Sequence, residues 1–293
     1  MQVISTGSRA LDALLLGGVR RGLLYCVFGA SGSGKTQLCM QLALNSAMAS
    51  KSARVFIVDV KGDFRPERII DIYKARMDGG EGKVGEGGRS KHGNNTHMNS
   101  RDGGSGYNAD INAIIGIMDR IYVQRAYHVD DIFSSLSYVD SMYERYDHGV
   151  SFLIVEDSPS LFRLEYGSKS AEGHLRLMRL MHDLALRAVL RNTAVIVTNG
   201  VASSARDEHE GVDATTVTGL DEEEVRERQI MDRSVSMFAH FKVRLERLSS
   251  RMKDEEGMRA IVDGSVFRAT LLQPLVKSNK ALFKIVERGI VDI

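Results

Sequence analysis

The chain has little of what a disulfide-stabilised or membrane-spanning protein needs. It contains two cysteines, three prolines and no tryptophan among 293 residues. Cys26 and Cys39 are too few for a disulfide framework and lack the spacing of a metal site, so both are interpreted as core residues in a reducing compartment. No apolar run approaches the ~20 residues of a membrane helix, and no secretory signal opens the chain. The sequence therefore predicts a nuclear or cytosolic protein that makes no membrane contact.

An excess of either charge is also missing. The formal net charge is +1, from 39 basic and 38 acidic residues. Any attraction to nucleic acid must therefore come from local patches rather than from the whole chain. With 43% hydrophobic and 26% charged residues, the composition is typical of a globular protein that buries a substantial core. Composition alone leaves its partners open.

Short apolar runs alternate with amphipathic segments, which is typical of a parallel sheet covered by helices. Helices are predicted over 36–48 and 65–77 and around 175–188, and the buried strands fall at 22–30, 53–60, 119–127, 150–157 and 193–200. The segments 238–248, 258–273 and 281–293 resemble antiparallel strands joined by glycine-containing turns. We expect one α/β domain over 1–293, with a mainly parallel central sheet and antiparallel strands at its C-terminal end.

Two stretches interrupt this pattern. Residues 78–106 are rich in glycine and contain almost no bulky apolar residue, so we expect a disordered insertion there. Its two histidines, His92 and His97, are interpreted as residues of a solvated loop rather than as metal ligands. Residues 206–234 are strongly acidic and are predicted to form a loop, either plainly solvated or docking a basic partner.

The stretch "FGASGSGKTQL" fits the pattern GxxxxGK[ST] in full. Such a loop turns its backbone N–H groups toward nucleotide phosphates, and the helix that follows adds the positive end of its dipole. The lysine is expected at the β- and γ-phosphates and the threonine hydroxyl at Mg²⁺. The predicted ATP-binding residues are Gly29, Ala30, Ser31, Gly32, Ser33, Gly34, Lys35, Thr36 and Gln37.

A P-loop also needs a carboxylate for Mg²⁺ at the end of a neighbouring buried strand. The run "FLIVED" offers Glu156 and Asp157 at that place, and with Thr36 they are the predicted Mg²⁺ ligands. Asp157 has the side-chain length most often used, whereas the strand register could instead aim Glu156 at the metal. Both remain candidates at this point.

Several segments together resemble the RecA/RadA recombinases, and above all the eukaryotic strand-exchange recombinases and their paralogues. They are "ISTGSRALDALLLGGVRRG", "GKTQLCMQLAL", "FIVDVKGDFRPERI", "IYVQRAYHVDDI", "FLIVEDSPSLFRLEY", "VIVTNG" and "QPLVKSNKALFKIVERGIVD", in the order in which the family has them. The resemblance implies a RecA-like ATPase core that binds ATP and Mg²⁺. It also places Pro274 in a segment similar to the family's nucleotide cap at a subunit interface.

Two positions depart from the family pattern. Where the family carries a glutamate that activates the attacking water, this chain has Lys61, and a protonated lysine cannot accept a proton. Asp59 and Asp63 flank it and are the candidate substitutes. Where the family has a glutamine that senses the γ-phosphate, this chain has Gly200. Hydrolysis is therefore expected to be lost or weakened.

The resemblance also implies places for DNA contact. The basic candidates follow "LFRLEY" and are Arg163, Lys169, Arg176 and Arg179, which are equally interpretable as an exposed helix face. The acidic stretch 206–234 would repel phosphates, because DNA affinity depends mainly on cationic neutralisation. The chain opens almost directly at "ISTGS", so we expect a hetero-oligomer rather than long self-assembled filaments.

Three functional classes follow from the resemblance. The first, which we favour, is a nuclear ATP-binding recombinase paralogue, which joins other paralogues or the main recombinase and helps it load on single-stranded DNA during homologous recombination and double-strand break repair. The second is a DNA-dependent ATPase active in strand exchange. The third is a RecA-like regulatory ATPase unrelated to DNA.

Overall fold

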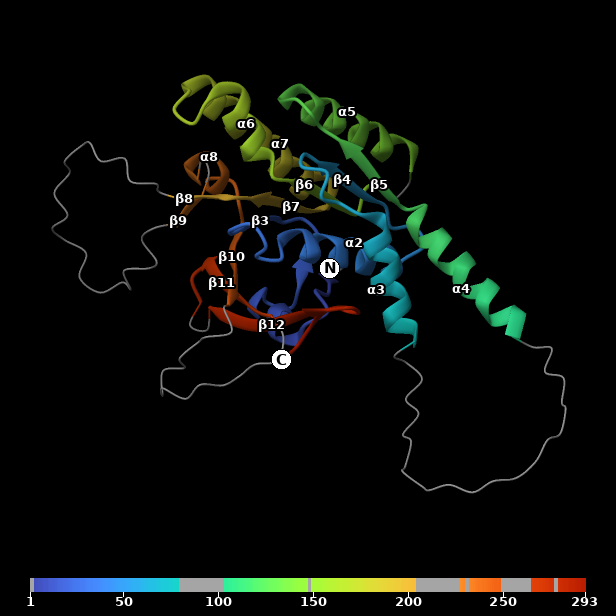
Figure 1. Ribbon diagram of the computed structural model, residues 1–293. Coiled ribbons are helices and arrows are strands. Elements are labelled where there is room, and N and C mark those ends of the chain that lie inside the picture. Colours follow the sequence, from blue (N-terminus) through green and yellow to red (C-terminus); the bar gives the residue numbers. More distant parts are fainter. Residues whose placement is uncertain are drawn as a thin grey trace, which may run out of the picture.

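The computed structural model describes residues 3–78, 103–146, 149–203, 227–229, 232–248, 265–276 and 279–293. Its centre is a nine-stranded sheet in the order β13-β12-β11-β10-β3-β7-β6-β4-β5. Figure 1 shows helices on both sides of this sheet. The chain therefore forms layers, with the sheet between two groups of helices.

One part of the sheet is parallel. It consists of β3 (Leu24–Phe28), β4 (Val55–Asp59), β5 (Ile121–Arg125), β6 (Phe152–Glu156), β7 (Ala194–Asn199) and β10 (Phe241–Leu248), which runs parallel to β3. The five strands predicted from apolar runs are all present, with ends one or two residues inside the predicted ones. β3, which leads into the P-loop, lies between β7 and β10.

The other part of the sheet is antiparallel and comes from the C-terminal third. It is formed by β10 together with β11 (Val266–Gln273), β12 (Lys280–Val286) and β13 (Gly289–Val291). This arrangement confirms the predicted fold class, an α/β core with C-terminal antiparallel strands. Two small pairs lie apart from the main sheet, β1 (Val3–Ile4) with β2 (Val19–Arg20) and β8 (Val201–Ser203) with β9 (Glu227–Gln229).

The helices divide between the two faces of the sheet. One core cluster includes residues of α1 (Arg9–Leu14), α2 (Lys35–Ala49), α3 (Pro66–Asp78) and α4 (Gly103–Met118). The other includes residues of α5 (Val129–Arg145), α6 (Ser158–Tyr166), α7 (Ala171–Arg191) and α8 (Asp232–Ser236). Among the described helices, none is long and apolar enough to cross a bilayer.

Successive residues of the central strands enter opposite clusters. Tyr25 and Val27 pack with α2, whereas Leu24 and Cys26 face the layer of α7. A strand that is buried on both faces has no polar side to alternate with its apolar side, which is why these strands are continuous apolar runs in the sequence. Both cysteines, Cys26 and Cys39, are fully buried.

Both predicted interruptions need correction at their edges. Asp78 is the last residue of α3, and Gly103–Gly106 already belong to α4, so a disordered insertion over 78–106 is too long. Ile114 and Ile117 anchor α4 in the core, and an anchored helix gains one hydrogen bond for each residue by which it extends. Within 206–234, residues 227–229 form β9 and 232–234 begin α8. The rest of both stretches, including His92 and His97, lies outside the described residues.

Candidate functional site

The predicted P-loop connects β3 to α2 and has a backbone that requires glycine. A Cβ atom on Gly29 would lie 2.1 Å from the carbonyl oxygen of Leu245 in β10, so any side chain there would collide with the neighbouring strand. Gly34, with φ of 93°, precedes α2, and no side chain caps that helix end. The first N–H groups of α2 are thus left for an anion.

Lys35 folds its side chain back over the loop. Its ammonium group donates hydrogen bonds to the carbonyl oxygens of Gly29 and Ala30 at 2.7 and 2.8 Å. Burial lowers the pKa of Lys35, and the nearby Lys61 ammonium lowers it further. The amino group of Lys35 is therefore held against the P-loop, where phosphates would enter.

Glu156 ends β6 and turns toward the P-loop. Its Oε1 accepts a hydrogen bond from the hydroxyl of Thr36, and its Oε2 is buried with no hydrogen-bond partner. Burial raises the pKa of Glu156 to about 7, against the effect of the Thr36 hydrogen bond. The buried oxygen without a partner points to a ligand that the protein itself does not supply.

The side chain of Asp157, the next residue, does not contact Thr36 and has other partners. Its backbone adopts the left-handed conformation, with φ of 52°, as the chain leaves β6 for α6. Its Oδ2 lies 2.5 Å from the ammonium of Lys61 and accepts a 2.7 Å hydrogen bond from the hydroxyl of Ser160. The two adjacent carboxylates thus have different partners, Thr36 for Glu156 and Lys61 for Asp157.

The two aspartates beside Lys61 also differ. Asp59 is buried at the end of β4, accepts a 2.6 Å hydrogen bond from the N–H of Gly62, and lies 3.6 Å from the guanidinium of Arg125. Asp63 instead lines the cavity above the P-loop. Of the two, Asp63 is the one whose carboxylate faces the space in which a nucleotide would react.

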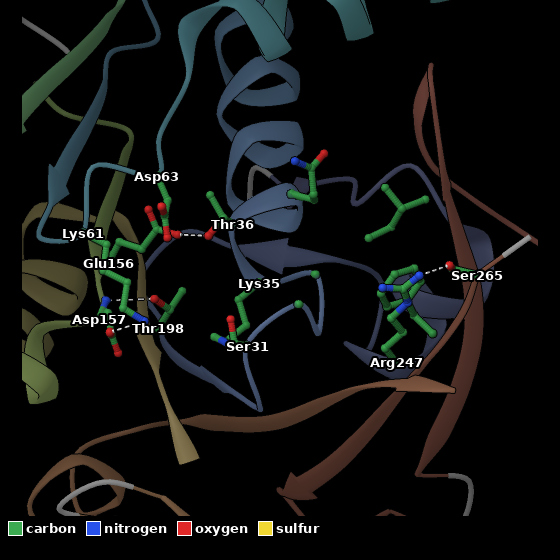
Figure 2. A pocket seen from close by; sticks show the side chains of 15 residues that line it. Ser31, Lys35, Thr36, Lys61, Asp63, Glu156, Asp157, Thr198, Arg247 and Ser265 are labelled. Carbon is green, nitrogen blue, oxygen red and sulfur yellow. Dashed lines mark hydrogen bonds and ion pairs between the residues drawn. The ribbon is translucent and has the colours of Figure 1, made fainter. Parts of the chain in front are cut away.

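A cavity of about 370 Å³ lies over the P-loop and joins these groups. Figure 2 shows Thr36, Lys61, Asp63 and Glu156 together on one side of it, Lys35 in the middle, and Arg247 and Ser265 on the other side. The latter side comes from the C-terminal strands, where Arg247 donates a 2.6 Å hydrogen bond to the hydroxyl of Ser265. Phe267 and Ile285 line the same wall.

Sequence reasoning missed this second wall. No motif marks Arg247, Ser265 or Phe267, and Ile285 lies in the last of the family-like segments but was not assigned to the site. The four residues come together because β10 pairs with β3 across more than two hundred residues of chain. Pro274, expected in the nucleotide cap, follows β11 and does not line the cavity. A cap at a subunit interface stays a prediction.

The residues present fit a magnesium–nucleotide complex. The loop excludes side chains at Gly29, the N-terminus of α2 is uncapped, and Glu156 has a buried oxygen without a partner. Within the described part of the chain, no three His, Cys, Asp or Glu side chains gather to hold a metal by themselves. A Mg²⁺ ion held here would therefore take most of its oxygen ligands from phosphate and water, as is usual for this ion.

The basic residues predicted for DNA contact do not form one free patch. Arg176 donates a 2.7 Å hydrogen bond to the carboxylate of Asp130 and another to the hydroxyl of Tyr166. Arg163, Lys169 and Arg179 are exposed on α6, α7 and the turn between them. Of the four residues predicted for DNA contact, Arg163, Lys169 and Arg179 are thus the exposed ones and Arg176 is partly buried.

The loop after β7 is the last predicted feature near the site. Gly200 follows Asn199 directly, at the point where β7 ends and β8 begins. With no side chain, it contributes no group to the cavity. Thr198 is the residue of β7 that reaches the lining, and it also accepts a 2.9 Å hydrogen bond from the backbone N–H of Asp157.

The part of the chain that carries the P-loop also has a known counterpart. Residues 1–86 match the Rad51 family model. The match confirms the resemblance to RecA/RadA-like recombinases over the segment from the N-terminus through β3, α2, β4 and α3. Lys61 falls inside this Rad51-like segment, whereas Glu156, Asp157 and the second wall lie outside it.

Proposed function

We propose that this chain is a nuclear ATP-binding recombinase paralogue, which works as a subunit of a hetero-oligomer. In this role it helps a recombinase to load on, or stay on, single-stranded DNA during homologous recombination and double-strand break repair. The observation that carries the proposal is the ion pair of Lys61 with Asp157, because it puts a cation in a nucleotide site at the position where an active recombinase has a proton acceptor.

The chain's own residues would hold ATP as follows. The N–H groups of the P-loop and of the first turn of α2 bind the phosphates, and Lys35 leaves the carbonyl oxygens of its own loop to contact the β- and γ-phosphates. The hydroxyl of Thr36 and the carboxylate of Glu156 would hold Mg²⁺, which supplies charge neutralisation for the phosphates when bound. Arg247 and Phe267 form the wall on the far side of the cavity from Glu156.

Hydrolysis needs a group that orients water and accepts its proton, and such a group contributes roughly 10²- to 10⁴-fold to a rate. Lys61 is paired with the carboxylate of Asp157 and offers no carboxylate to accept the proton. The oxygens of Asp59 are engaged by Gly62 and Arg125. Asp63 is left as the candidate that faces the cavity, so we propose slow turnover and a main role for ATP as an assembly ligand.

Contact with DNA in this proposal is shared with partner subunits. Three exposed basic residues, Arg163, Lys169 and Arg179, would neutralise only a few phosphates, and non-specific affinity decreases as fewer phosphates are contacted. The partner subunits, which are other paralogues or the main recombinase, would supply the rest of the DNA surface.

The decisive experiment pairs equilibrium binding of ATP with single-turnover hydrolysis, each with and without single-stranded DNA. Lys35→Ala is the test variant, and Lys51→Ala is the matched control, since Lys51 is exposed at the far end of α2. Binding that depends on Lys35 but not on Lys51, with negligible hydrolysis, supports the proposal. Turnover stimulated by DNA would favour an active strand-exchange ATPase instead.

The partner role needs its own readout. Co-purification of wild-type protein and of Lys35→Ala with candidate recombinase subunits should show weaker assembly for the variant. Assembly that is unchanged in Lys35→Ala would contradict the ligand role of ATP. Tight ATP binding with no recombinase-like subunit and no DNA contact would favour a regulatory ATPase.

A further inference from the structure

Lys61 is positioned by the surrounding structure rather than left as a free surface lysine. It lies in a turn in which the N–H of Gly62 donates to the carboxylate of Asp59. The guanidinium of Arg125 donates to the carbonyl oxygen of Lys61 at 3.1 Å, and a Cβ on Gly62 would collide with that guanidinium. The backbone of Lys61 is therefore fixed from two sides, and this directs its side chain toward the cavity.

The ammonium group of Lys61 retains access to solvent while it is held. Its partner Asp157 is 2% exposed, whereas the side chain of Lys61 is 46% exposed and lines the cavity. Asp157 is in turn fixed by Ser160. A lysine stem held at one end by a buried carboxylate can donate its remaining N–H groups to an anion in the cavity, because an ammonium has three donors.

Lys61 lies at the end of the cavity where the terminal phosphates of a nucleotide would bind. Thr36 and Glu156 mark the end that would hold Mg²⁺ and the terminal phosphates, and Figure 2 places Lys61 on that side, away from Arg247. Lys61 is also close enough to Lys35 to lower the pKa of its ammonium. The two lysines thus approach the same part of the cavity from the P-loop and from the turn after β4.

Acidic side chains outnumber basic ones at this end of the cavity. Asp63, Glu156 and Asp157 all line it, so a terminal phosphate brought there would meet three carboxyl groups, and a Mg²⁺ ion held by Thr36 and Glu156 would neutralise only part of this charge. Among the described residues, Lys35 and Lys61 are the lysines that line this end. Like charges repel more strongly in such a partly buried cavity than in bulk water, because less water screens them. The ammonium of Lys61 offsets this repulsion on the side opposite the P-loop.

We propose that Lys61 is a second phosphate-binding cation, held in place by Asp157, that makes the site select a nucleoside triphosphate over a diphosphate. This inference rests on the proposed function, since it assumes that a nucleotide occupies the P-loop. Lys61, which stands where the family has a glutamate that accepts a proton from water, therefore also increases the affinity of the site for unhydrolysed ATP. Selectivity arises because the terminal phosphate is the group that reaches Lys61.

The test is the ratio of affinities for N-methylanthraniloyl-ATP and N-methylanthraniloyl-ADP, measured by equilibrium fluorescence titration in Mg²⁺ and again in EDTA. Lys61→Met should weaken ATP binding about tenfold, the range of one charge-assisted hydrogen bond, and should change ADP binding less than about twofold. Lys61→Arg keeps the charge and should keep the preference. Lys51→Met is the matched control, with the same change at an exposed lysine outside the cavity.

A second variant guards against misfolding. Lys61→Met leaves the buried Asp157 without its cation, whereas Lys61→Met combined with Asp157→Asn removes both charges together. The double variant should fold and show the same loss of ATP preference. An unchanged ATP-to-ADP ratio in both variants overturns the inference. If Lys35→Ala abolishes binding in that case, the proposed function stands, and if Lys35→Ala has no effect, both fail.

Discussion

Thr36 donates a hydrogen bond to Oε1 of Glu156, which joins the first turn of the P-loop helix to the end of β6. Glu156 and Asp157 are neighbours in the sequence, but only Glu156 makes this contact. The carboxyl group of Glu156, whose pKa is raised, therefore lies against the Thr36 hydroxyl, and both groups would bind the same Mg²⁺ ion. The contact couples the protonation of Glu156 to the stability of the site.

Glu156→Gln should flatten the dependence of stability on pH. Burial raises the pKa of Glu156 from its ordinary value of 4.5 to about 7. Between those values the folded protein binds more protons than the unfolded chain, so its free energy of unfolding falls as pH rises, by up to about 1.4 kcal/mol per pH unit. Urea unfolding at pH 5, 6 and 7 measures this slope. Equal slopes in wild type and variant would show that Glu156 is already ionised when folded.

Gly29→Ala should disrupt the P-loop far more than Gly32→Ala. A Cβ at position 29 would lie 2.1 Å from the backbone of Leu245, which cannot move without disturbing β10. At Gly32 nothing lies within 4 Å, and only the left-handed backbone opposes a side chain. That strain costs roughly 1–2 kcal/mol. Thermal unfolding and ATP titration of both variants test this ranking, and a larger effect at Gly32 would contradict it.

Lys169→Ala and Arg163→Ala should weaken contact with single-stranded DNA, whereas Arg176→Ala should not act through phosphates. Arg176 is partly buried and its guanidinium donates both to Asp130 and to the hydroxyl of Tyr166. The plot of log affinity against log salt has a negative slope, and each lost phosphate contact makes it less steep by about 0.7 for single strands. Fluorescence anisotropy over a salt series measures it. The largest change of slope in Arg176→Ala would mean that the ion pair opens for DNA.

Asp292→Asn should weaken the junction between the two ends of the chain, mainly at neutral pH. The carboxylate of Asp292 accepts hydrogen bonds from the Ser8 hydroxyl at 2.6 Å and from the N–H of Ala10 at 3.1 Å. These bonds lower the pKa of Asp292 to about 2, against an ordinary value of 3.8. Its contribution is therefore present above pH 3.8 and is lost as pH falls through about 2. Thermal unfolding of both proteins at pH 7 should separate them, and identical midpoints would contradict the role of this junction.

The sequence was sufficient for features that depend on local patterns. The P-loop, the five parallel strands and the first turn of α3 at Pro66 follow from runs of apolar residues, glycine spacing and helix-start signals. Short-range chemistry decides such features, so they appear in the sequence at the place where they occur in the fold.

Features that depend on register or on distant pairing were not predictable. The choice between Glu156 and Asp157 depends on where β6 ends and on the left-handed backbone of Asp157. The ion pair of Lys61 with Asp157 joins two strand ends that are adjacent only because β4 pairs with β6. The wall of Arg247 and Phe267 needs the C-terminal strands in place. None of these contacts produces a pattern in the residues next to it in the sequence.

The placement of β3 between β7 and β10 determines when the site can form during synthesis. The P-loop is made early, but the strand that covers Gly29 and the wall that closes the cavity come from 241–285. Pairings between such distant segments form late, since a long loop must close first. The nascent chain would thus carry a complete P-loop sequence long before it has a nucleotide site. Nucleotide capture would then report that the whole chain has folded, and truncations after β7 should not bind ATP.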